Sequence, residues 1–365
     1  MRILLIPIEK ASEEVKTGDW HATIFHLLSR KHRIIGVVRP RWHSMAHKGM
    51  KKDVLLAYYW LKSFVFGITH SGRYDLIYCI NTPSALVGLL LSLFSGKPFV
   101  WDAGNPSLFN PGPLSQPFFM LEKIIARKAK WVRMISREYR DRYMAEGFSG
   151  KKMVIIPHLV NLDSIERAYA DKVVLRRKLG LGVGERILMF IGQGSTPFNL
   201  EAIRWLNDEL APLVKGKIIV AGANTIPARY PNLVFIGYVP DIYEYIYACD
   251  AAVVPIWKSS GAPVPSTRTI DFMSCAKPVV VTDFLLEVIP ELVDGENIYI
   301  AKIEGEFKRK VLCILENPAD ADRMGRNARG LVESEYSWSA GIEKLEGLLS
   351  DNIPAEGIIE KAERK

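Results

Sequence analysis

The sequence has few cysteines, no long apolar run and no evident metal-binding motif. Its four cysteines lie far apart and form no C-x-x-C pair, which argues against a disulfide framework and against a zinc site. The longest apolar run, residues 86–94, is far shorter than the roughly 20 residues that a transmembrane helix needs. No D-x-D pair stands in a loop suited to a divalent metal. We therefore expect a reduced protein that holds no metal and has no membrane-spanning helix.

The start of the chain lacks the pattern of a secretory signal. Met1 and Arg2 lead directly into the strand-like run Ile3–Pro7, without an apolar h-region or a small-residue cleavage site. Together with the unpaired cysteines, this predicts a cytoplasmic protein. The 365 residues are 48% hydrophobic and 24% charged, which favours a folded chain over a disordered one, and the length suits two domains.

Charge is divided unevenly along the chain. Residues 1–165 hold 24 Lys+Arg and 12 Asp+Glu, a balance of +12, and residues 166–365 hold 24 and 28, a balance of −4; the sum is the overall +8. A basic first half indicates an anionic partner. Membrane phospholipid, a lipid-diphosphate acceptor and an acidic polysaccharide all fit, so we expect peripheral contact with the inner face of the cell membrane.

Apolar runs rich in β-branched residues alternate with helical patterns in both halves of the chain. This alternation predicts an α/β fold in which parallel sheets carry helices on both faces. The strand pattern stops after Pro157 and restarts near Arg186, so we expect two doubly wound, Rossmann-like domains with a linker near residues 158–172 and a cleft between them. The predicted strands are residues 2–8, 34–38, 76–80, 99–102, 132–135 and 153–156 in the first half, and 186–191, 218–220, 234–236, 251–254, 279–281 and 298–300 in the second.

The segment from Ser259 to Asp283 carries the strongest functional signal. A loop rich in glycine, proline and serine leads into a short helix that contains Arg268 and Asp271, and a buried strand follows. Unpaired backbone N–H groups at a helix start attract phosphate, and a carboxylate one turn later can accept hydrogen bonds from ribose hydroxyls. The pattern fits a nucleotide-sugar site. It fits equally an ordinary loop, helix and strand of an α/β domain.

Longer stretches of the sequence resemble a known family. The run Ala248–Ile256 and the segments Asp271–Val280 and Ile289–Asn297 together look like the C-terminal nucleotide-binding domain of the GT-B glycosyltransferases. The similarity is to glycosyltransferase family 4 (group 1) and its relatives with variant loops. It is strong from about residue 131 to residue 297, and it includes residues 135–143, 154–163, 190–205 and 232–241.

The resemblance implies a GT-B architecture and a sugar-transfer reaction. Residues 1–165 would bind the acceptor, residues 166–338 would bind the nucleotide sugar, and residues 339–365 would form a helix that crosses back to the first domain, followed by a tail. The implied hexosyltransferase moves a sugar from a nucleoside diphosphate donor to a lipid-linked or polysaccharide acceptor, with retention and without a cofactor. A nucleotide-sugar epimerase on the same fold and a binding protein without catalysis remain alternatives.

Arg268 and Asp271 are the residues expected to hold the donor. The always-ionised fork of Arg268 matches phosphate oxygens, and its position resembles that of the family's phosphate-binding Lys or Arg. Asp271 matches the second acid of the family's E-x7-E motif, which holds the ribose hydroxyls. The alternatives are a solvent-facing arginine and hydroxyl residues that only cap the helix. The other residues expected to bind the donor are Gly192, Gly194, Ser195, Tyr238, Val239, Lys258, Gly261, Ala262, Val264, Ser266 and Thr267.

Three positions depart from the family pattern. Pro263 stands where the family has the first acid of its motif, Gly104 stands where it has a histidine, and the turn Gly192–Asn199 lacks the usual Arg and Lys. Asp102 remains beside the lost histidine, and with Arg268 it is a candidate catalytic residue. It could be a general base toward the acceptor hydroxyl, a hydrogen-bond partner to the donor sugar, or a carboxylate that caps its loop. A base there would allow inversion, whereas in a retaining reaction the departing phosphate accepts the proton.

A basic segment in the first half is expected to contact the acceptor or the membrane. It precedes an apolar, aromatic-rich helix over residues 54–66, and a basic loop beside such a helix fits an interfacial anchor. A helix buried between sheet and linker fits the pattern as well. No nucleic-acid-binding signature accompanies these cations, so nucleic acid is not expected as a partner. The residues of this segment are Arg39, Arg41, Trp42, Lys48, Lys51 and Lys52.

Overall fold

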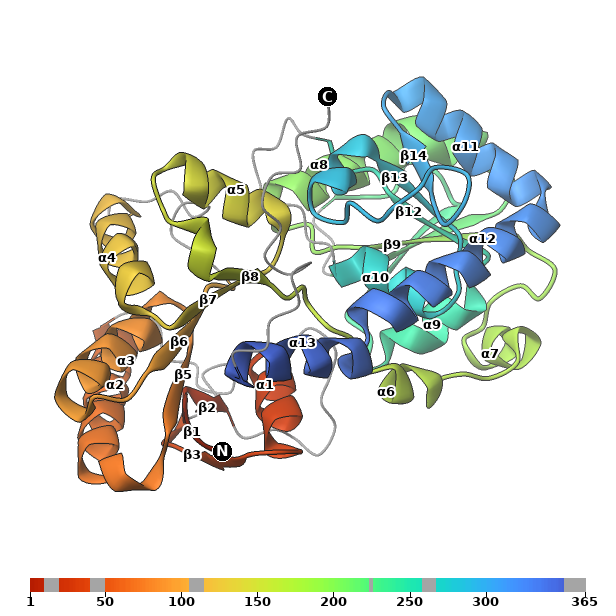
Figure 1. The fold of residues 1–365 in the computed structure, drawn as a ribbon. Helices are drawn as coiled ribbons and strands as arrows, with labels where there is room; N and C mark the ends of the chain where they lie inside the picture. The colour runs from red at the N-terminus through yellow and green to blue at the C-terminus, as the bar shows by residue number, and fades with distance from the viewer. Residues whose placement is uncertain (10–19, 40–49, 105–114, 223–225, 258–266, 351–365) are drawn as a thin grey trace. The chain divides into compact units, whose positions relative to one another are not determined.

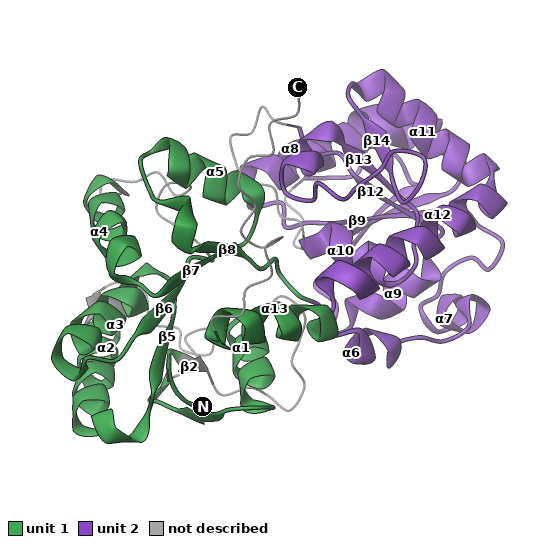
Figure 2. Ribbon diagram, in the orientation of Figure 1, with its two compact units in different colours: residues 1–159, 338–365 green, residues 160–337 purple. Residues whose placement is uncertain are grey.

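The computed structural model describes residues 1–9, 20–39, 50–104, 115–222, 226–257 and 267–350. The chain divides into two compact units, residues 1–159 with 338–365 and residues 160–337, which are coloured separately in Figure 2. It passes into the second unit after Leu159 and returns to the first after Ser337. The domain boundaries predicted from the sequence lay after residues 165 and 338. Each unit has its own sheet and its own apolar core.

The first unit is built on a six-stranded parallel sheet (Figure 1). Its strand order is β3-β1-β5-β6-β7-β8, and every neighbouring pair is parallel. Two short strands, β2 (Ile8–Glu9) and β4 (Val38–Arg39), form a separate parallel pair, so the predicted strand over residues 34–38 is divided between β3 and β4. The strands of the sheet are β1 (Arg2–Ile6), β3 (Arg33–Ile35), β5 (Leu76–Ile80), β6 (Phe99–Asp102), β7 (Trp131–Met134) and β8 (Met153–Ile155).

Helices cover both faces of this sheet because both faces are apolar. Leu4 and Ile6 of β1 belong to one core cluster, whereas Ile3 and Leu5 belong to another, as the alternation of side chains along a strand requires. The first cluster is covered by α2, α3, α4 and α5, and the second by α1 and α13. The helices of this unit are α1 (Trp20–Ser29), α2 (Met50–Thr69), α3 (Thr82–Ser95), α4 (Ser115–Lys128), α5 (Arg137–Ala145) and α13 (Trp338–Ser350).

The last helix, α13, packs on the unit in which the chain begins. Trp338 and Leu348 lie in the same core cluster as Ile24 of α1. A Cβ on Gly341 would lie 1.9 Å from the side chain of Leu159, so only glycine allows the helix to approach the end of the first unit's chain this closely. The final amphipathic pattern of the sequence therefore serves to cover the first sheet.

The second unit repeats the architecture with a second six-stranded parallel sheet, in the order β11-β10-β9-β12-β13-β14. Its strands are apolar along their length because helices cover both faces of the sheet. The two doubly wound sheets predicted from the sequence are confirmed. The strands are β9 (Ile187–Ile191), β10 (Lys217–Ala221), β11 (Leu233–Gly237), β12 (Ala251–Val254), β13 (Val279–Thr282) and β14 (Tyr299–Ala301). The helices are α6 (Leu162–Glu166), α7 (Lys172–Lys178), α8 (Pro197–Trp205), α9 (Ile242–Ala248), α10 (Thr267–Ser274), α11 (Glu304–Glu316) and α12 (Pro318–Leu331).

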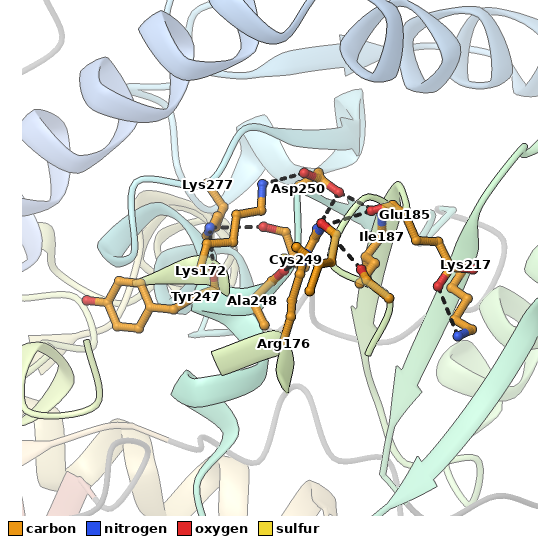
Figure 3. Close-up of polar contacts among 12 residues, drawn as sticks. Lys172, Arg176, Glu185, Ile187, Lys217, Tyr247, Ala248, Cys249, Asp250 and Lys277 are labelled. Carbon is orange, nitrogen blue, oxygen red and sulfur yellow. Dashed lines mark hydrogen bonds and ion pairs between the residues drawn. The ribbon is translucent and has the colours of Figure 1, made fainter. Parts of the chain in front are cut away.

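An ion-pair network fastens the amino end of the second sheet (Figure 3). Asp250, just before β12, accepts hydrogen bonds from Arg176 of α7 at 2.8 Å and from the backbone N–H of Ile187 in β9 at 2.7 Å. It also pairs with Lys172, at the start of α7. The network ties α7 to two adjacent strands, at the end of the sheet opposite to the carboxyl ends where ligands of α/β sheets bind. We therefore assign it a structural role.

Candidate functional site

The second sheet reverses its strand order beside β9. The chain runs from β9 to β10 on one side and later places β12 on the other side. Ligands of doubly wound sheets bind outside the carboxyl ends of the strands at such a switch point. The segments that leave this edge are the turn after β9, the loop after β11 and the chain that leads from β12 to α10. These segments contain the residues predicted to bind the donor.

Arg268 lies in the first turn of α10 and exposes only 8% of its surface. Its guanidinium carbon lies 5.3 Å from the ring centre of Phe190, in β9, and 5.9 Å from that of Phe198, in the first turn of α8. These contacts place the start of α10 beside the turn that joins β9 to α8. Arg268 is thus not the solvent-facing arginine of the alternative interpretation.

The guanidinium of Arg268 is short of hydrogen-bond acceptors. Its Nη1 is buried, and none of the residues that the structure describes accepts a hydrogen bond from it. Burial lowers the pKa of Arg268 to about 10, against a smaller upward effect of the Asp271 carboxylate. A buried donor without an acceptor costs about 1–3 kcal/mol, and more when it is charged. An anionic ligand that reached this group would recover that free energy.

Asp271 lies one turn after Arg268 and accepts a hydrogen bond from the hydroxyl of Tyr243 at 2.8 Å. The residue is part-exposed at the surface, but its carboxyl group is enclosed by protein, and this burial raises its pKa to about 6. The bond from Tyr243 and the charge of Arg268 act in the opposite direction, and burial outweighs both. An ionised carboxylate has about four acceptor positions, so one phenol leaves capacity for the hydroxyls of a ligand.

The loop between β11 and α9 contains Tyr238 and Val239. Tyr238 exposes 81% of its surface, more than any other large hydrophobic residue in the described part of the chain. Asp241 ends the loop by accepting a hydrogen bond from the Tyr243 N–H at 2.9 Å, which fixes the start of α9. Tyr243 therefore connects this loop to Asp271. Sequence analysis did not single out Tyr243, although the capping Asp241 two residues earlier was a usable signal.

The turn after β9 is tightly packed. A Cβ on Gly192 would lie 2.7 Å from the ring of Phe190 and 2.9 Å from the side chain of Asn199. Packing within the turn therefore explains this glycine without reference to a ligand. Further along the turn, Gly194 is buried and Ser195 is exposed. A ligand at this turn would thus contact Ser195 and the backbone around it, and it would not contact the buried Gly192.

Two helix starts flank Arg268. α8 follows Thr196, whose side chain makes no capping hydrogen bond, and α10 begins at the part-exposed Thr267. The first-turn N–H groups of a helix have no partner within the helix and attract anions. The site thus combines a buried cation with two positive helix ends. The predicted donor-binding residues Lys258, Gly261, Ala262, Val264 and Ser266 lie outside the described residues.

Asp102 ends β6 in the first unit and is fully buried. Its Oδ2 accepts hydrogen bonds from the Trp20 indole at 2.7 Å and from the Tyr78 hydroxyl at 3.0 Å, and its Oδ1 accepts one from Arg133 at 2.9 Å. A general base needs an oxygen that can reach the acceptor hydroxyl. Both oxygens of Asp102 serve buried partners instead, so this arrangement favours a structural carboxylate over a catalytic base.

Arg133 and His158 complete this cluster, and sequence analysis had singled out neither. The fully buried Arg133 donates to the Ile156 carbonyl at 2.6 Å, its guanidinium carbon lies 3.8 Å from the ring centre of Trp20, and no described residue accepts from its Nη2. Burial, and to a smaller extent the charge of Arg133, lower the pKa of His158 to about 4. The signal in the sequence is a charged residue inside the apolar strand Trp131–Met134.

Gly104, which stands where the family has a histidine, lies beside this cluster. A Cβ on Gly104 would lie 3.5 Å from Nη1 of Arg133 and 3.5 Å from Oδ1 of Asp102, which is ordinary van der Waals contact. The position is therefore not closed to a side chain by sterics. The charged pair of Asp102 and Arg133 occupies the polar neighbourhood of this strand end.

Among the residues that the structure describes, no group of His, Cys, Asp and Glu side chains suits a metal ion. None of the described helices combines the length and the apolar character that a membrane span requires. The segment predicted to contact the acceptor or the membrane is only partly described. The structure describes only the backbone at Arg39, Lys51 and Lys52, and Arg41, Trp42 and Lys48 lie outside the described residues.

Comparison with known proteins adds to this geometry. Residues 185–317 match the family of glycosyl transferases group 1. An uncharacterized glycosyltransferase of Methanocaldococcus jannaschii, MJ1607, is 21% identical over 294 residues, which cover 74% of each chain. The match to the family contains all the described residues that were predicted to bind the donor.

Solved structures share the fold of the whole chain. Anabaena Alr3699/HepE in complex with UDP has a TM-score of 0.72 and 17% identity, and the match covers 96% of this chain and 100% of that one. Sucrose-phosphate synthase from Thermosynechococcus elongatus has a TM-score of 0.72 and 16% identity, with 96% and 98% covered. From the family match and the two doubly wound sheets together, this chain is a glycosyltransferase of the GT-B fold whose second unit carries the group 1 match.

Proposed function

We propose that this protein transfers a hexosyl group from a nucleoside diphosphate sugar to a lipid-linked or polysaccharide acceptor at the inner face of the cell membrane. The observation that carries the proposal is Arg268, a buried cation at the switch point. Its Nη1 group donates a hydrogen bond to none of the described residues. A diphosphate would satisfy this group, because hydrogen bonds from a guanidinium to phosphate oxygens are short and strong. No metal ion is required, since the cation and the helix starts supply the positive charge.

The donor would lie along the carboxyl edge of the second sheet. Its diphosphate would contact Arg268 and the first turns of α8 and α10, and its ribose hydroxyls would donate to Asp271. The base would lie against Tyr238, whose exposed ring offers an apolar surface. The Anabaena structure contains UDP, which makes uridine diphosphate the first nucleotide to test.

We propose that the transfer proceeds with retention. The acceptor oxygen bonds to the anomeric carbon while the bond from that carbon to the diphosphate oxygen breaks, and the acceptor proton passes to the departing diphosphate on the same face. Arg268 stabilises the negative charge that develops on the leaving group. This route needs no base from the protein, which agrees with the occupied oxygens of Asp102.

The test is a transfer assay with a panel of nucleotide sugars and a membrane extract as the source of acceptor. Arg268→Met removes the charge but fills similar space, and we expect it to lower turnover by about a hundredfold or more, because a lost charge-assisted contact costs a few kcal/mol. Arg326→Met, which changes an exposed arginine of α12, is the matched control and should retain full turnover.

Three products distinguish the candidate functions. A new glycan or glycolipid supports transfer, an isomerised donor shows an epimerase, and binding of the nucleotide sugar without any turnover shows a protein that has lost catalysis. Equal turnover of Arg268→Met and wild type would contradict the site assignment even if the protein proved to be a transferase.

A further inference from the structure

Three helices lie side by side over one face of the first sheet (Figure 1). α2 and α3 are in close contact, because a Cβ on Gly67 would lie 2.6 Å from the side chain of Leu91. The rings of Phe64 and Phe94 also join these two helices, with 5.9 Å between their centres. The three helices therefore form one continuous layer, whose inner side packs on the sheet.

The outer side of this layer is apolar. Of the eighteen exposed residues that the structure describes on α2, α3 and α4, eleven are large hydrophobic residues. On α3 every exposed residue is large and apolar, and Phe94 and Leu93 expose 72% and 66% of their surfaces. We call this surface the α2–α4 face, defined by Leu61, Val65, Leu93, Phe94, Met120 and Ile124. Exposed patches of this kind mark interaction sites in soluble proteins.

The other unit shows that such exposure is not general in this chain. On α11 and α12, which also have an outward side, none of the exposed residues is a large hydrophobic one. Those two helices follow the usual amphipathic pattern, with polar residues toward solvent. The apolar character of the α2–α4 face is therefore a property of this layer, and it needs a partner.

The charged residues that the structure describes on the α2–α4 face have one sign. Lys62, Arg127 and Lys128 are exposed, and they are the charged members of the eighteen exposed residues. α3 has no charged residue. The acid of α4, Glu122, is fully buried and accepts hydrogen bonds from Thr82 and Tyr143. The described face is thus apolar with cations and without an exposed carboxylate.

We propose that the α2–α4 face docks on an anionic lipid bilayer. Apolar side chains would enter the boundary between headgroups and acyl chains, and the cations would lie at the anionic headgroups. A second copy of the chain is a poorer partner, because a two-fold interface would bring the same cations together with no described acid to neutralise them. The inference rests on the membrane location in the proposed function, and it assigns that contact to a surface other than the basic segment 39–52.

Vesicle co-sedimentation of the full chain tests the proposal. Leu90→Glu/Leu93→Glu places two charges on α3 at exposed positions and leaves the contact between Phe64 and Phe94 intact, so the fold should be unaffected. Val174→Glu/Leu213→Glu makes the same changes at exposed apolar positions of the second unit and is the matched control. A second face variant, Met120→Glu/Ile124→Glu, guards against a local effect at α3. The vesicles contain phosphatidylcholine with phosphatidylglycerol, or phosphatidylcholine alone.

We expect wild type and the control variant to pellet with the anionic vesicles and much less with the neutral ones, and both face variants to lose at least about tenfold of this binding. Wild type that does not bind anionic vesicles, or face variants that bind as wild type does, would overturn the proposal. So would a wild-type dimer that the face variants convert to a monomer, since the face would then join two copies. UDP binding by the same preparations tests the donor site separately, so failure of one inference is not mistaken for failure of the other.

Discussion

The hydroxyl of Tyr243 donates a hydrogen bond to the Asp271 carboxylate at 2.8 Å, and this contact joins α9 to α10 in the second unit. Burial nevertheless raises the pKa of Asp271 to about 6. The group proposed to hold ribose therefore changes its charge close to neutral pH. Two predictions follow from this position of the pKa.

Nucleotide affinity should fall as the pH drops through about 6. Above that pH the ionised Asp271 accepts hydrogen bonds from ribose hydroxyls, and below it the protonated group is a weaker acceptor. Titration calorimetry with UDP from about pH 5 to pH 8 measures the effect. The terminal phosphate of UDP also titrates in this range, so Asp271→Asn provides the baseline. Identical pH profiles for the two proteins would show that Asp271 does not contact the nucleotide.

Asp271→Asn should stabilise the second unit near neutral pH. Because the folded-state pKa of about 6 lies above the ordinary value of 3.8, the folded state binds more protons between these two pH values, and the charged group costs stability above pH 6. The shift corresponds to at most about 3 kcal/mol. Asn keeps an acceptor for Tyr243. Urea unfolding should show a higher midpoint for the variant near pH 7 and no difference near pH 4; a lower midpoint near pH 7 would refute the argument.

Asp102→Asn should destabilise the first unit by about 3–5 kcal/mol, because it leaves the buried Arg133 without its counter-ion. Replacing both partners with apolar residues, in Asp102→Leu/Arg133→Met, should recover much of this loss. Asp75→Asn, which breaks an exposed pair with Arg2 in the same unit, should have a much smaller effect since solvent screens such pairs. Urea unfolding measures all three, and a fully stable Asp102→Asn variant would contradict the structural role of this carboxylate.

His158 should make the first unit sensitive to mild acid. Its folded-state pKa of about 4 lies below the ordinary value of 6.5, so the unfolded state binds more protons, and stability is lost as the pH falls from about 6.5 to about 4. The expected loss is about 3 kcal/mol. His158→Gln should reduce the slope of unfolding free energy against pH in this window. Asp271 contributes a slope of opposite sign, so the comparison is made between variant and wild type at each pH.

The sheets of both units were predictable from the sequence because strands buried on both faces must be apolar throughout. The predicted strands over residues 76–80, 99–102 and 251–254 coincide with β5, β6 and β12. The strand over residues 34–38 was predicted too long, since alternation alone does not show that the chain leaves one sheet after Ile35 and pairs with β2 at Val38.

The candidate site was predictable only in part. Arg268 was identifiable because it follows a Gly-rich and Pro-rich loop, but its burial against Phe190 and Phe198 depends on contacts between distant segments. The role of Asp102 could not be decided from the sequence for the same reason. A carboxylate at a strand end looks available in a sequence, and only the fold shows that Trp20 and Arg133 use its oxygens.

Calorimetric titration of wild type and Arg268→Met with UDP, GDP and ADP tests the central claim most directly. The account predicts that wild type binds one of these diphosphates and that Arg268→Met binds it about a hundredfold more weakly, because the buried guanidinium loses its charge-assisted contacts, while Arg326→Met binds as wild type does. Equal affinity of Arg268→Met and wild type for that diphosphate would contradict the claim that Arg268 holds the donor.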